Sequence, residues 1–130
     1  MHIVAEFYDA DAGALADPDG VVAAMEKATK AAGATALSSH KHYFSPHGVS
    51  CVVIIQESNL CIHTWPEHGY AAADFFTCGT DCNTWKAFAV LKEYFKTERV
   101  ETMELKRGNT KLISDPSILS KTLALPKSAK

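Results

Sequence analysis

A serine that follows a glutamate separates two strongly apolar runs of this chain, and the side chains around it could carry out acyl chemistry. Glu57 and Ser58 are followed by His63 five residues later, while Ser50 and Cys78 lie on neighbouring predicted strands. A serine hydroxyl attacks a carbonyl when a nearby base accepts its proton and hydrogen-bond donors stabilise the oxyanion. These residue types therefore indicate a nucleophile, Ser58, and a base, His63.

A simpler interpretation of the same residues competes with catalysis. The segment has no GxSxG nucleophile elbow, and no particular acidic residue is placed to orient the His63 ring. Serine between two strands is commonly a turn residue, and a histidine in an apolar strand is commonly a core residue with its hydrogen bonds satisfied. Spacing alone therefore favours a turn serine and a packed histidine over a hydrolase site.

The composition indicates one domain and excludes several kinds of partner. The chain has 130 residues, 47% of them hydrophobic, which suffices for a single core. A net charge of −2 and a pI of about 6.3 give no basic surface for nucleic acid or anionic membranes. No apolar run approaches the roughly 18–20 residues that span a bilayer, and the N-terminus lacks a signal-peptide pattern. We expect a cytoplasmic protein without nucleic-acid or membrane partners.

The cysteines are expected to be reduced thiols, because nothing in the chain indicates export. Cys78 and Cys82, taken with His40 and His42, have the residue types of a zinc site. Their spacing matches no common structural zinc site, in which CxxC pairs dominate. We therefore expect no metal site.

Hydrophobic periodicity predicts six strands and two helices. The strands are expected at 2–8, 34–44, 49–55, 59–65, 71–77 and 100–105. The first helix is expected to begin at Pro18 after an Asp17 N-cap and to end near Ala32, and the second to begin after Asn83 or Asp81. The core face of the second helix is expected to comprise Trp85, Phe88, Leu91 and Phe95.

These elements predict an α+β fold. Short spacings between strands favour antiparallel pairing, and the β-branched run at 49–55 is expected to be buried on both faces. We expect a two-layer α/β sandwich in which two helices cover one face of a largely antiparallel sheet. The domain is expected to span residues 1–108 and to be followed by a C-terminal tail, 109–130.

The chain resembles a known enzyme family along most of its length. Residues 48–79 read GVSCVVIIQESNLCIHTWPEHGYAAADFFTCG, with the Glu-Ser pair, IHTWPE and FFTCG in one register. The likeness continues in EFYDAD, KAAGATALSSHKHYFSPHGVS, WKAF and ERVETMELKRG, and covers about residues 2–108. This combination is similar to the S-adenosylmethionine decarboxylase proenzymes of the bacterial and archaeal short-chain class. Asn59 stands where that family commonly has histidine, Cys51 where it has glycine, and Gln56 where it has a small residue.

The resemblance implies that the chain processes itself. Ser58 would attack the carbonyl of Glu57 in an N→O acyl shift, and β-elimination of the ester would leave a pyruvoyl group at residue 58. The products would be a β chain, 1–57, and an α chain that starts at residue 58. By position, His63 matches the family's base for elimination, and Ser50 matches a residue that supports processing. An ordinary amide is a poor electrophile, so this peptide must be strained or polarised.

The resemblance also implies the later decarboxylation. The pyruvoyl group derived from Ser58 would form a Schiff base with the amine of S-adenosylmethionine and accept electrons as carbon dioxide leaves. Cys78 matches the family's proton donor, and a thiol with an ordinary pKa of about 8.5 exists in part as the acid at neutral pH. The positions that match substrate-binding residues are Phe44, which would stack on adenine, Leu60, Trp65, and Glu67, which would bind ribose hydroxyls.

Three functions remain open at this point. The first is a decarboxylase that makes the aminopropyl donor for spermidine synthesis; the resemblance implies a homodimer, (αβ)2 after cleavage, with active sites at or near the interface. The second keeps the pyruvoyl group but acts on arginine or ornithine, whose cationic side chains need carboxylates such as Asp74 and Glu67. The third is an unprocessed, non-catalytic homologue that serves as a binding partner.

Overall fold

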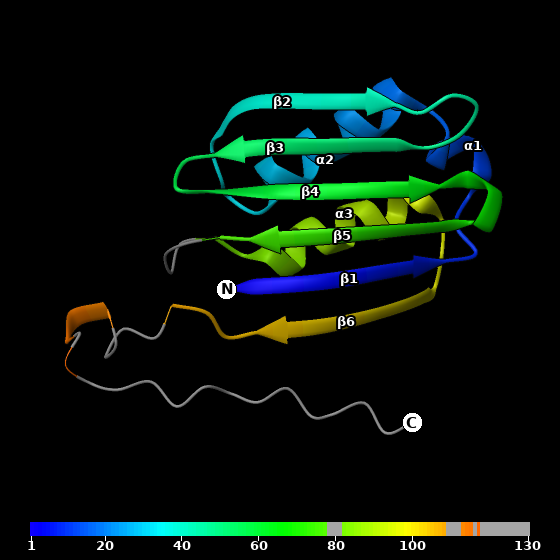
Figure 1. The fold of residues 1–130 in the computed structure, drawn as a ribbon. Coiled ribbons are helices and arrows are strands. Elements are labelled where there is room, and N and C mark those ends of the chain that lie inside the picture. Colours follow the sequence, from blue (N-terminus) through cyan, green and yellow to red (C-terminus); the bar gives the residue numbers. More distant parts are fainter. Residues whose placement is uncertain (78–81, 109–112, 116, 118–130) are drawn as a thin grey trace.

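Six strands pair into one antiparallel sheet in the part of the chain that the structure describes. The computed structural model describes residues 1–77, 82–108, 113–115 and 117. The strands are β1 (His2–Tyr8), β2 (Ala36–Tyr43), β3 (Val49–Ile55), β4 (Ser58–Trp65), β5 (Tyr70–Phe76) and β6 (Arg99–Leu105). They lie in the order β2-β3-β4-β5-β1-β6, and every neighbouring pair is antiparallel (Figure 1). The expected antiparallel sheet is confirmed.

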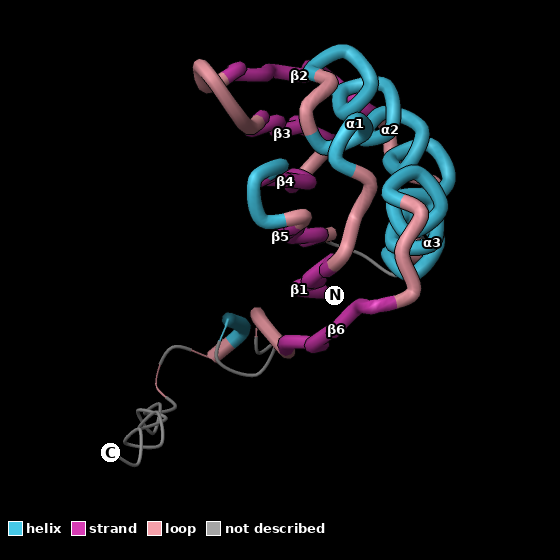
Figure 2. Tube along the Cα trace, turned by 90° about the vertical axis from the view of Figure 1, so that its right-hand side faces the viewer, coloured by secondary structure: helices cyan, strands magenta, loops and turns pink. Residues whose placement is uncertain are grey.

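Helices cover one face of this sheet. They are α1 (Ala12–Leu15), α2 (Pro18–Ala31) and α3 (Thr84–Phe95), and Figure 2 shows all three on the same side. The expected α+β sandwich with two long helices on one face is confirmed. The short α1 lies where the sequence predicts only a connection, because four residues are too few to show a helical period. A 3₁₀ turn, η1 (Pro66–His68), joins β4 to β5.

Both long helices begin at side chains that cap them. The Asp17 carboxylate accepts a hydrogen bond from the backbone N–H of Gly20 at 3.0 Å, and the Asn83 carbonyl oxygen accepts one from the N–H of Trp85 at 3.1 Å. These bonds satisfy N–H groups that have no partner inside the helix. Gly33 follows α2 with a φ of +82°, which glycine adopts freely. The predicted caps Asp17 and Asn83 are therefore confirmed.

The core fills the space between the sheet and the helices. Phe7, Phe75 and Phe95 are the largest fully buried side chains, and the ring centroids of Phe7 and Phe95 lie 5.4 Å apart. Strand residues that alternate with exposed ones supply the sheet side of this core. The packing of helix on sheet thus follows the hydrophobic pattern of the sequence.

The expected core face of α3 is wrong at its first position. Leu91 and Phe95 are fully buried as predicted, but the side chain of Trp85 is 39% exposed. The helix is rotated so that Thr84 and Ala87 face the sheet at the same spacing, and both are fully buried. The helical spacing of Trp85 from Phe88 predicted that Trp85 belonged to the core, but Thr84 and Ala87 fit the same period.

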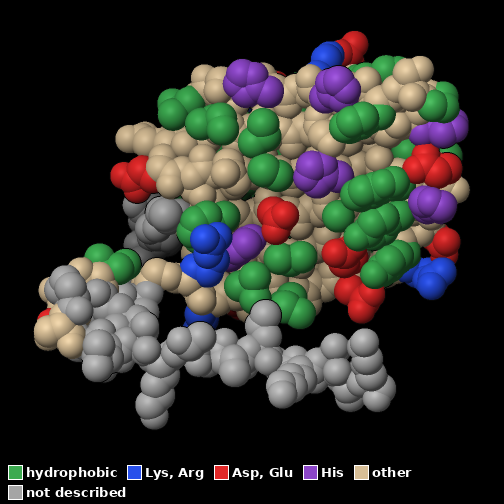
Figure 3. All heavy atoms as spheres, in the orientation of Figure 1, with side chains coloured by type: hydrophobic (Ala, Val, Ile, Leu, Met, Phe, Trp, Pro, Cys, Tyr) green, Lys and Arg blue, Asp and Glu red, His purple; other side chains and the backbone are tan. Residues whose placement is uncertain are grey.

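The opposite face of the sheet has no helix on it, and we call it the open face. In β3, Val53 and Ile55 are buried under the helices, whereas Ile54 points to the open face and is 37% exposed. The expectation that this strand is buried on both faces is therefore wrong. Figure 3 shows hydrophobic side chains on the open face, interspersed with histidines and acidic residues. None of the helices in the described residues is long and apolar enough to cross a membrane.

Candidate active site

The turn between β3 and β4 places backbone strain directly before Ser58. Ile55 pairs with Ser58 across the hairpin, so Gln56 and Glu57 alone make the turn. Glu57 has a φ of +75°, in the left-handed region, which costs a residue other than glycine roughly 1–3 kcal/mol. The peptide bond that Ser58 would attack thus begins at a strained residue. A two-residue turn without glycine is the sequence signal that could have revealed this strain.

The Ser58 hydroxyl is buried and is free of hydrogen bonds to the described residues. Its Oγ atom has no accessible surface and no such partner. Ser58 pairs with the buried Ile55 and shares its face of the sheet, the face that the helices cover. A serine that served the turn would bond to nearby backbone groups, as Ser, Asn and Asp commonly do in turns. The Ser58 hydroxyl therefore does not stabilise the turn through a hydrogen bond to the described residues.

Ser50 and His63 form a hydrogen-bonded pair on the open face. They are cross-strand partners in the register of β3 and β4, and Ser50 Oγ lies 2.7 Å from His63 Nδ1. The His63 ring is exposed, so it is not a packed core histidine. If Nδ1 donates to the serine oxygen, Nε2 keeps its lone pair and can act as a base. The structure thus brings together two of the predicted site residues.

His63 and Ser58 are far apart within one chain. Both belong to β4, and five residues at about 3.3 Å each separate them by about 16 Å. An odd separation along a strand also puts their side chains on opposite faces of the sheet. A general base must lie within about 2.6–3.2 Å of the proton that it removes, or reach it through one water. His63 cannot serve the Ser58 of its own chain.

The predicted site residues therefore divide between two ends of the sheet. The Ser58 end, where β4 begins and β5 stops, carries Glu57 and Ser58; the His63 end, where β3 begins and β4 stops, carries Ser50 and His63 (Figure 1). Cys78, the predicted proton donor, lies outside the described residues. It directly follows Thr77, the first residue after β5, at the Ser58 end.

Three of the predicted substrate-binding residues lie at the His63 end. Phe44 follows β2 and is 48% exposed, and its backbone N–H donates to the carbonyl oxygen of Gly48 at 2.9 Å. Trp65 ends β4, 38% exposed, with its ring centroid 6.2 Å from that of His63. Glu67 lies exposed in η1. Two aromatic faces and a carboxylate are thus available to a ligand next to the Ser50–His63 pair.

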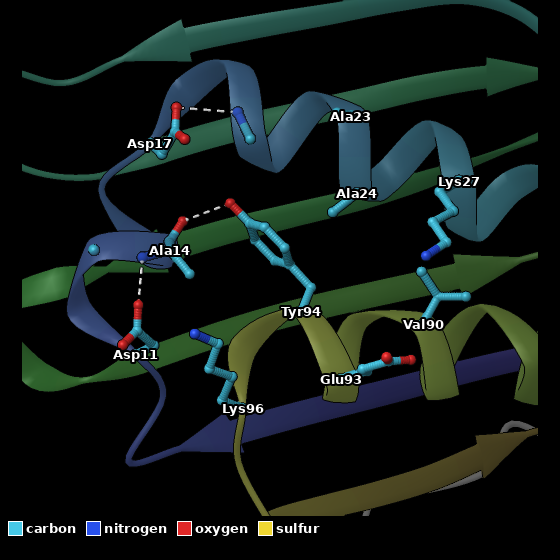
Figure 4. A pocket seen from close by; sticks show the side chains of 12 residues that line it. Asp11, Ala14, Asp17, Ala23, Ala24, Lys27, Val90, Glu93, Tyr94 and Lys96 are labelled. Atoms are coloured by element: carbon cyan, nitrogen blue, oxygen red, sulfur yellow. Dashed lines mark hydrogen bonds between the residues drawn. The ribbon is translucent and has the colours of Figure 1, made fainter.

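A separate pocket lies among the helices and contains none of the predicted site residues. It has a volume of about 580 Å³ and opens between α1, α2 and α3 (Figure 4). Two of its three acidic residues, Asp11 and Asp17, already accept hydrogen bonds as helix caps, and the Tyr94 hydroxyl donates to the carbonyl oxygen of Ala14 at 2.9 Å. Burial raises the pKa of Tyr94 to about 12.

A comparison with protein families decides what kind of protein this is. Residues 1–108 match the family model described as S-adenosylmethionine decarboxylase. The chain belongs to the S-adenosylmethionine decarboxylase family. The matched span contains both ends of the sheet, and so it includes Glu57–Ser58 as well as Ser50 and His63.

Named relatives and solved structures agree with this family. The S-adenosylmethionine decarboxylase proenzyme of Thermosipho africanus is 50% identical over 115 residues, 88% of each chain. That of Acidithiobacillus ferrooxidans is 48% identical over 115 residues, 88% of this chain and 86% of its own. The crystal structure of the Aquifex aeolicus adenosylmethionine decarboxylase matches with a TM-score of 0.73 and 35% identity, over 78% of this chain and 84% of that one. A Trypanosoma brucei AdoMetDC-delta26 monomer, 17% identical over 78% of this chain and 44% of that one, shares the fold with a TM-score of 0.57.

Leu60 lies in the core rather than at a surface. It is fully buried, alternates with the open-face residues Asn59 and Cys61, and points toward the helices. We predict that Leu60→Ala lowers the free energy of unfolding by about 2–5 kcal/mol, as for other buried leucines. Urea denaturation measures this change, with Leu37→Ala as the matched control, because Leu37 is 63% exposed on β2. Equal stability of the two variants would show that Leu60 is not a core residue.

The positions at which the chain departs from the family pattern carry no group that is ionised at neutral pH. Asn59 lies on the open face, where its side-chain oxygen accepts a weak hydrogen bond from Cys61 Sγ at 3.6 Å. Burial, with a smaller contribution from Glu26, raises the pKa of Cys51 to about 11, so its thiol is protonated at neutral pH. Gln56 is exposed in the turn. Within residues 1–77 and 82–108 the cysteines are free, and no cluster of His, Cys, Asp or Glu could hold a metal ion.

Proposed function

We propose that this chain cleaves its own peptide bond between Glu57 and Ser58 and, with the pyruvoyl group so formed, decarboxylates S-adenosylmethionine. The observation that carries the proposal is the strained φ of Glu57 beside the buried hydroxyl of Ser58, which has no partner among the described residues. Strain in the peptide and a free nucleophile next to it are what an acyl shift requires. The relatives' name, proenzyme, is consistent with a precursor that is processed.

The cleavage uses only groups of the chain and one water molecule. Ser58 Oγ bonds to the carbonyl carbon of Glu57, the C–N bond breaks, and the hydroxyl proton ends on the nitrogen of residue 58. A base then removes the α-proton of residue 58 while its Cβ–O bond breaks, which frees the Glu57 carboxylate. Water hydrolyses the remaining enamine through its imine, ammonia leaves, and residue 58 is a pyruvoyl group. We assign the base to His63, held by Ser50.

The residues of the Ser58 end fit this group. The buried hydroxyl of Ser58 marks a place that is closed to solvent, and its lack of partners among the described residues leaves it free to react. When present, the pyruvoyl group supplies an electron sink for the carbanion that remains after carbon dioxide leaves. We assign the return of a proton to that carbon to Cys78, on the resemblance alone. A thiol can deliver the proton because it is largely undissociated at neutral pH.

A second copy of the chain supplies the missing half of each site. His63 lies about 16 Å from Ser58 of its own chain, so the two must meet across an interface. When two sheets face each other across a two-fold axis perpendicular to their strands, the Ser58 end of one meets the His63 end of the other. Such an axis creates two equivalent sites in a closed dimer, (αβ)2 after cleavage.

The open face fits such a partner. It exposes Ile54, Trp65 and Met103 to 37%, 38% and 61%, and the Trp65 ring stacks on Tyr70 with centroids 5.2 Å apart. Six strands spaced about 4.8 Å apart and seven residues of about 3.3 Å give a face on the order of 650 Å². Stable interfaces bury about 800 Å² of accessible surface on each partner, so this flat face has nearly the area that a stable interface needs. Sheet packed on sheet is a common way to bury such a face.

We predict carbon dioxide release from S-adenosylmethionine and none from arginine or ornithine. Phe44 offers an aromatic face for adenine, and a sulfonium over the Trp65 ring gains about 0.5–2 kcal/mol. A basic amino acid would instead need free carboxylates, and Asp74 is already bonded to His2 Nε2 at 3.1 Å. Labelled carbon dioxide released from each substrate by the same processed preparation measures this. Release from arginine or ornithine alone would replace S-adenosylmethionine as the substrate.

A further inference from the structure

Three buried side-chain atoms have no hydrogen-bond partner among the residues that the structure describes. They are Ser58 Oγ, Thr77 Oγ1 and His2 Nδ1. All three lie at the Ser58 end of the sheet, where β4 and β1 begin and β5 stops. Buried hydroxyls are nearly always bonded in folded proteins, so each exception calls for an explanation. The proposed self-cleavage explains Ser58 but not Thr77.

The register of β4 and β5, continued one step beyond its last pair, brings Thr77 opposite Ser58. Asn59 of β4 pairs with Phe76 of β5, and one further step along both strands brings Ser58 to Thr77. Leu60 and Phe75, two residues away on each strand, are paired and fully buried on the helix-covered face, so the two hydroxyls share that face. Cβ atoms of directly opposed residues lie about 4.5–5.5 Å apart, which lets two short hydroxyl side chains meet.

The backbone of Thr77 is hydrogen-bonded on both sides, while its hydroxyl has no partner among the described residues. Its backbone N–H donates to the carbonyl oxygen of Met1 at 2.9 Å, and its own carbonyl oxygen accepts from the Met1 amino group at 2.8 Å. The residue is 1% exposed. In contrast, the other buried threonines among the described residues each direct their hydroxyl to a partner: Thr29 to Met25, Thr64 to Leu15, Thr84 to Met1 and Thr97 to Tyr8.

We propose that Thr77 is a positioning residue for self-cleavage. The two hydroxyls do not bond each other in this structure. When the Ser58 side chain rotates to another staggered rotamer, the Thr77 hydroxyl oxygen accepts its hydrogen bond and so directs Ser58 Oγ toward the carbonyl carbon of Glu57. In this step the Oγ–C bond forms, the C–N bond breaks and the Ser58 proton passes to the nitrogen of residue 58, while Thr77 neither gains nor loses a proton. The proposal rests on the proposed function, and it adds a residue that nothing in the sequence pattern indicated.

The test compares substitutions that separate the hydroxyl of Thr77 from its shape. Thr77→Val keeps the shape and removes the hydroxyl, Thr77→Ser keeps the hydroxyl, and Thr29→Val removes an equally buried hydroxyl elsewhere. Freshly translated precursor is followed by intact-mass spectrometry, and thermal unfolding reports the fold of each variant. We expect Thr77→Val to slow cleavage about tenfold or more, Thr77→Ser to stay within about threefold of the parent chain, and Thr29→Val to match the parent.

Hydroxylamine shows whether a variant is slow in forming the ester or in eliminating it, because hydroxylamine cleaves esters far faster than amides. If Thr77 orients the attacking oxygen, Thr77→Val forms the ester slowly, and hydroxylamine leaves the slow rate of its cleavage unchanged. Hydroxylamine that restores the cleavage of Thr77→Val to the parent rate would overturn the proposal, as would Thr77→Val at the parent rate or Thr77→Ser as slow as Thr77→Val. If Thr77→Val fails to fold, Thr77→Ala and Thr77→Ser differ by one hydroxyl and make the same comparison. A parent chain that never cleaves would refute the proposed function instead.

Discussion

The Ser58→Ala chain is expected to remain one full-length polypeptide under conditions in which the parent chain splits after Glu57. The substitution removes the only atom of the side chain that can attack the strained peptide, so the loss of cleavage is expected to be complete. Its cost to the fold is expected to be small, because Ser58 Oγ makes no hydrogen bond to the described residues and deleting an unpartnered buried hydroxyl relieves a desolvation penalty. Intact-mass spectrometry after prolonged incubation measures the outcome.

The control for this variant is Ser38→Ala, which removes an exposed serine hydroxyl from β2 and is expected to cleave like the parent. Thermal unfolding of both variants separates lost chemistry from lost structure. Cleavage that persists in a folded Ser58→Ala chain would overturn the assignment of the nucleophile. Loss of cleavage in both folded variants would show that the loss is not specific to the Ser58 hydroxyl, and would contradict its assignment as the nucleophile by this comparison.

Two variants that cannot cleave alone are expected to restore cleavage when they are mixed, if each site is shared between two copies of the chain. A tagged chain with His63→Ala supplies Ser58, and an untagged chain with Ser58→Ala supplies His63. In a mixed dimer one site then has both residues, while the other has neither. With equal amounts and random pairing, about half of the tagged chains meet a helper and are expected to be cleaved. The tagged chain alone is expected to stay intact, because no His63 reaches its Ser58.

The matched control for complementation replaces the helper with a chain that carries both substitutions. This helper folds and pairs in the same way but offers no His63, so the tagged chain is expected to remain uncut. Intact mass of the purified tagged chain, after co-expression, gives the cleaved fraction. Cleavage of tagged His63→Ala without any helper would remove His63 as the base. A failure of the Ser58→Ala helper, with mixed dimers present, would contradict the shared site.

Much of the fold could be predicted because local signals and burial agree. Asp17 and Asn83 cap the helices that they were expected to cap, and the alternation in β1 sets one buried face. The errors arise where tertiary context decides. The rotation of α3 leaves Trp85 exposed, and no helix covers the second face of β3 although Ile54 is apolar.

The candidate site was predictable in its residue types but not in its arrangement. The resemblance selected Ser58, His63 and Ser50. The five-residue spacing of Ser58 and His63 on one strand already implies that their side chains lie on opposite faces of the sheet, about 16 Å apart. The strain at Glu57 depends on a backbone torsion that residue types do not specify. Thr77 was missed because a threonine at the end of a strand is ordinary until its neighbours and hydrogen bonds are known.

Intact mass of the aged, unsubstituted chain, with and without a carbonyl reagent, tests the central claim most directly. The account predicts two species, residues 1–57 and a larger fragment from residue 58. The larger one is expected to be lighter by one ammonia than a fragment that starts with serine, to lack a free amino terminus and to react with the carbonyl reagent. A single full-length species after prolonged incubation would contradict the account and favour an unprocessed, non-catalytic homologue.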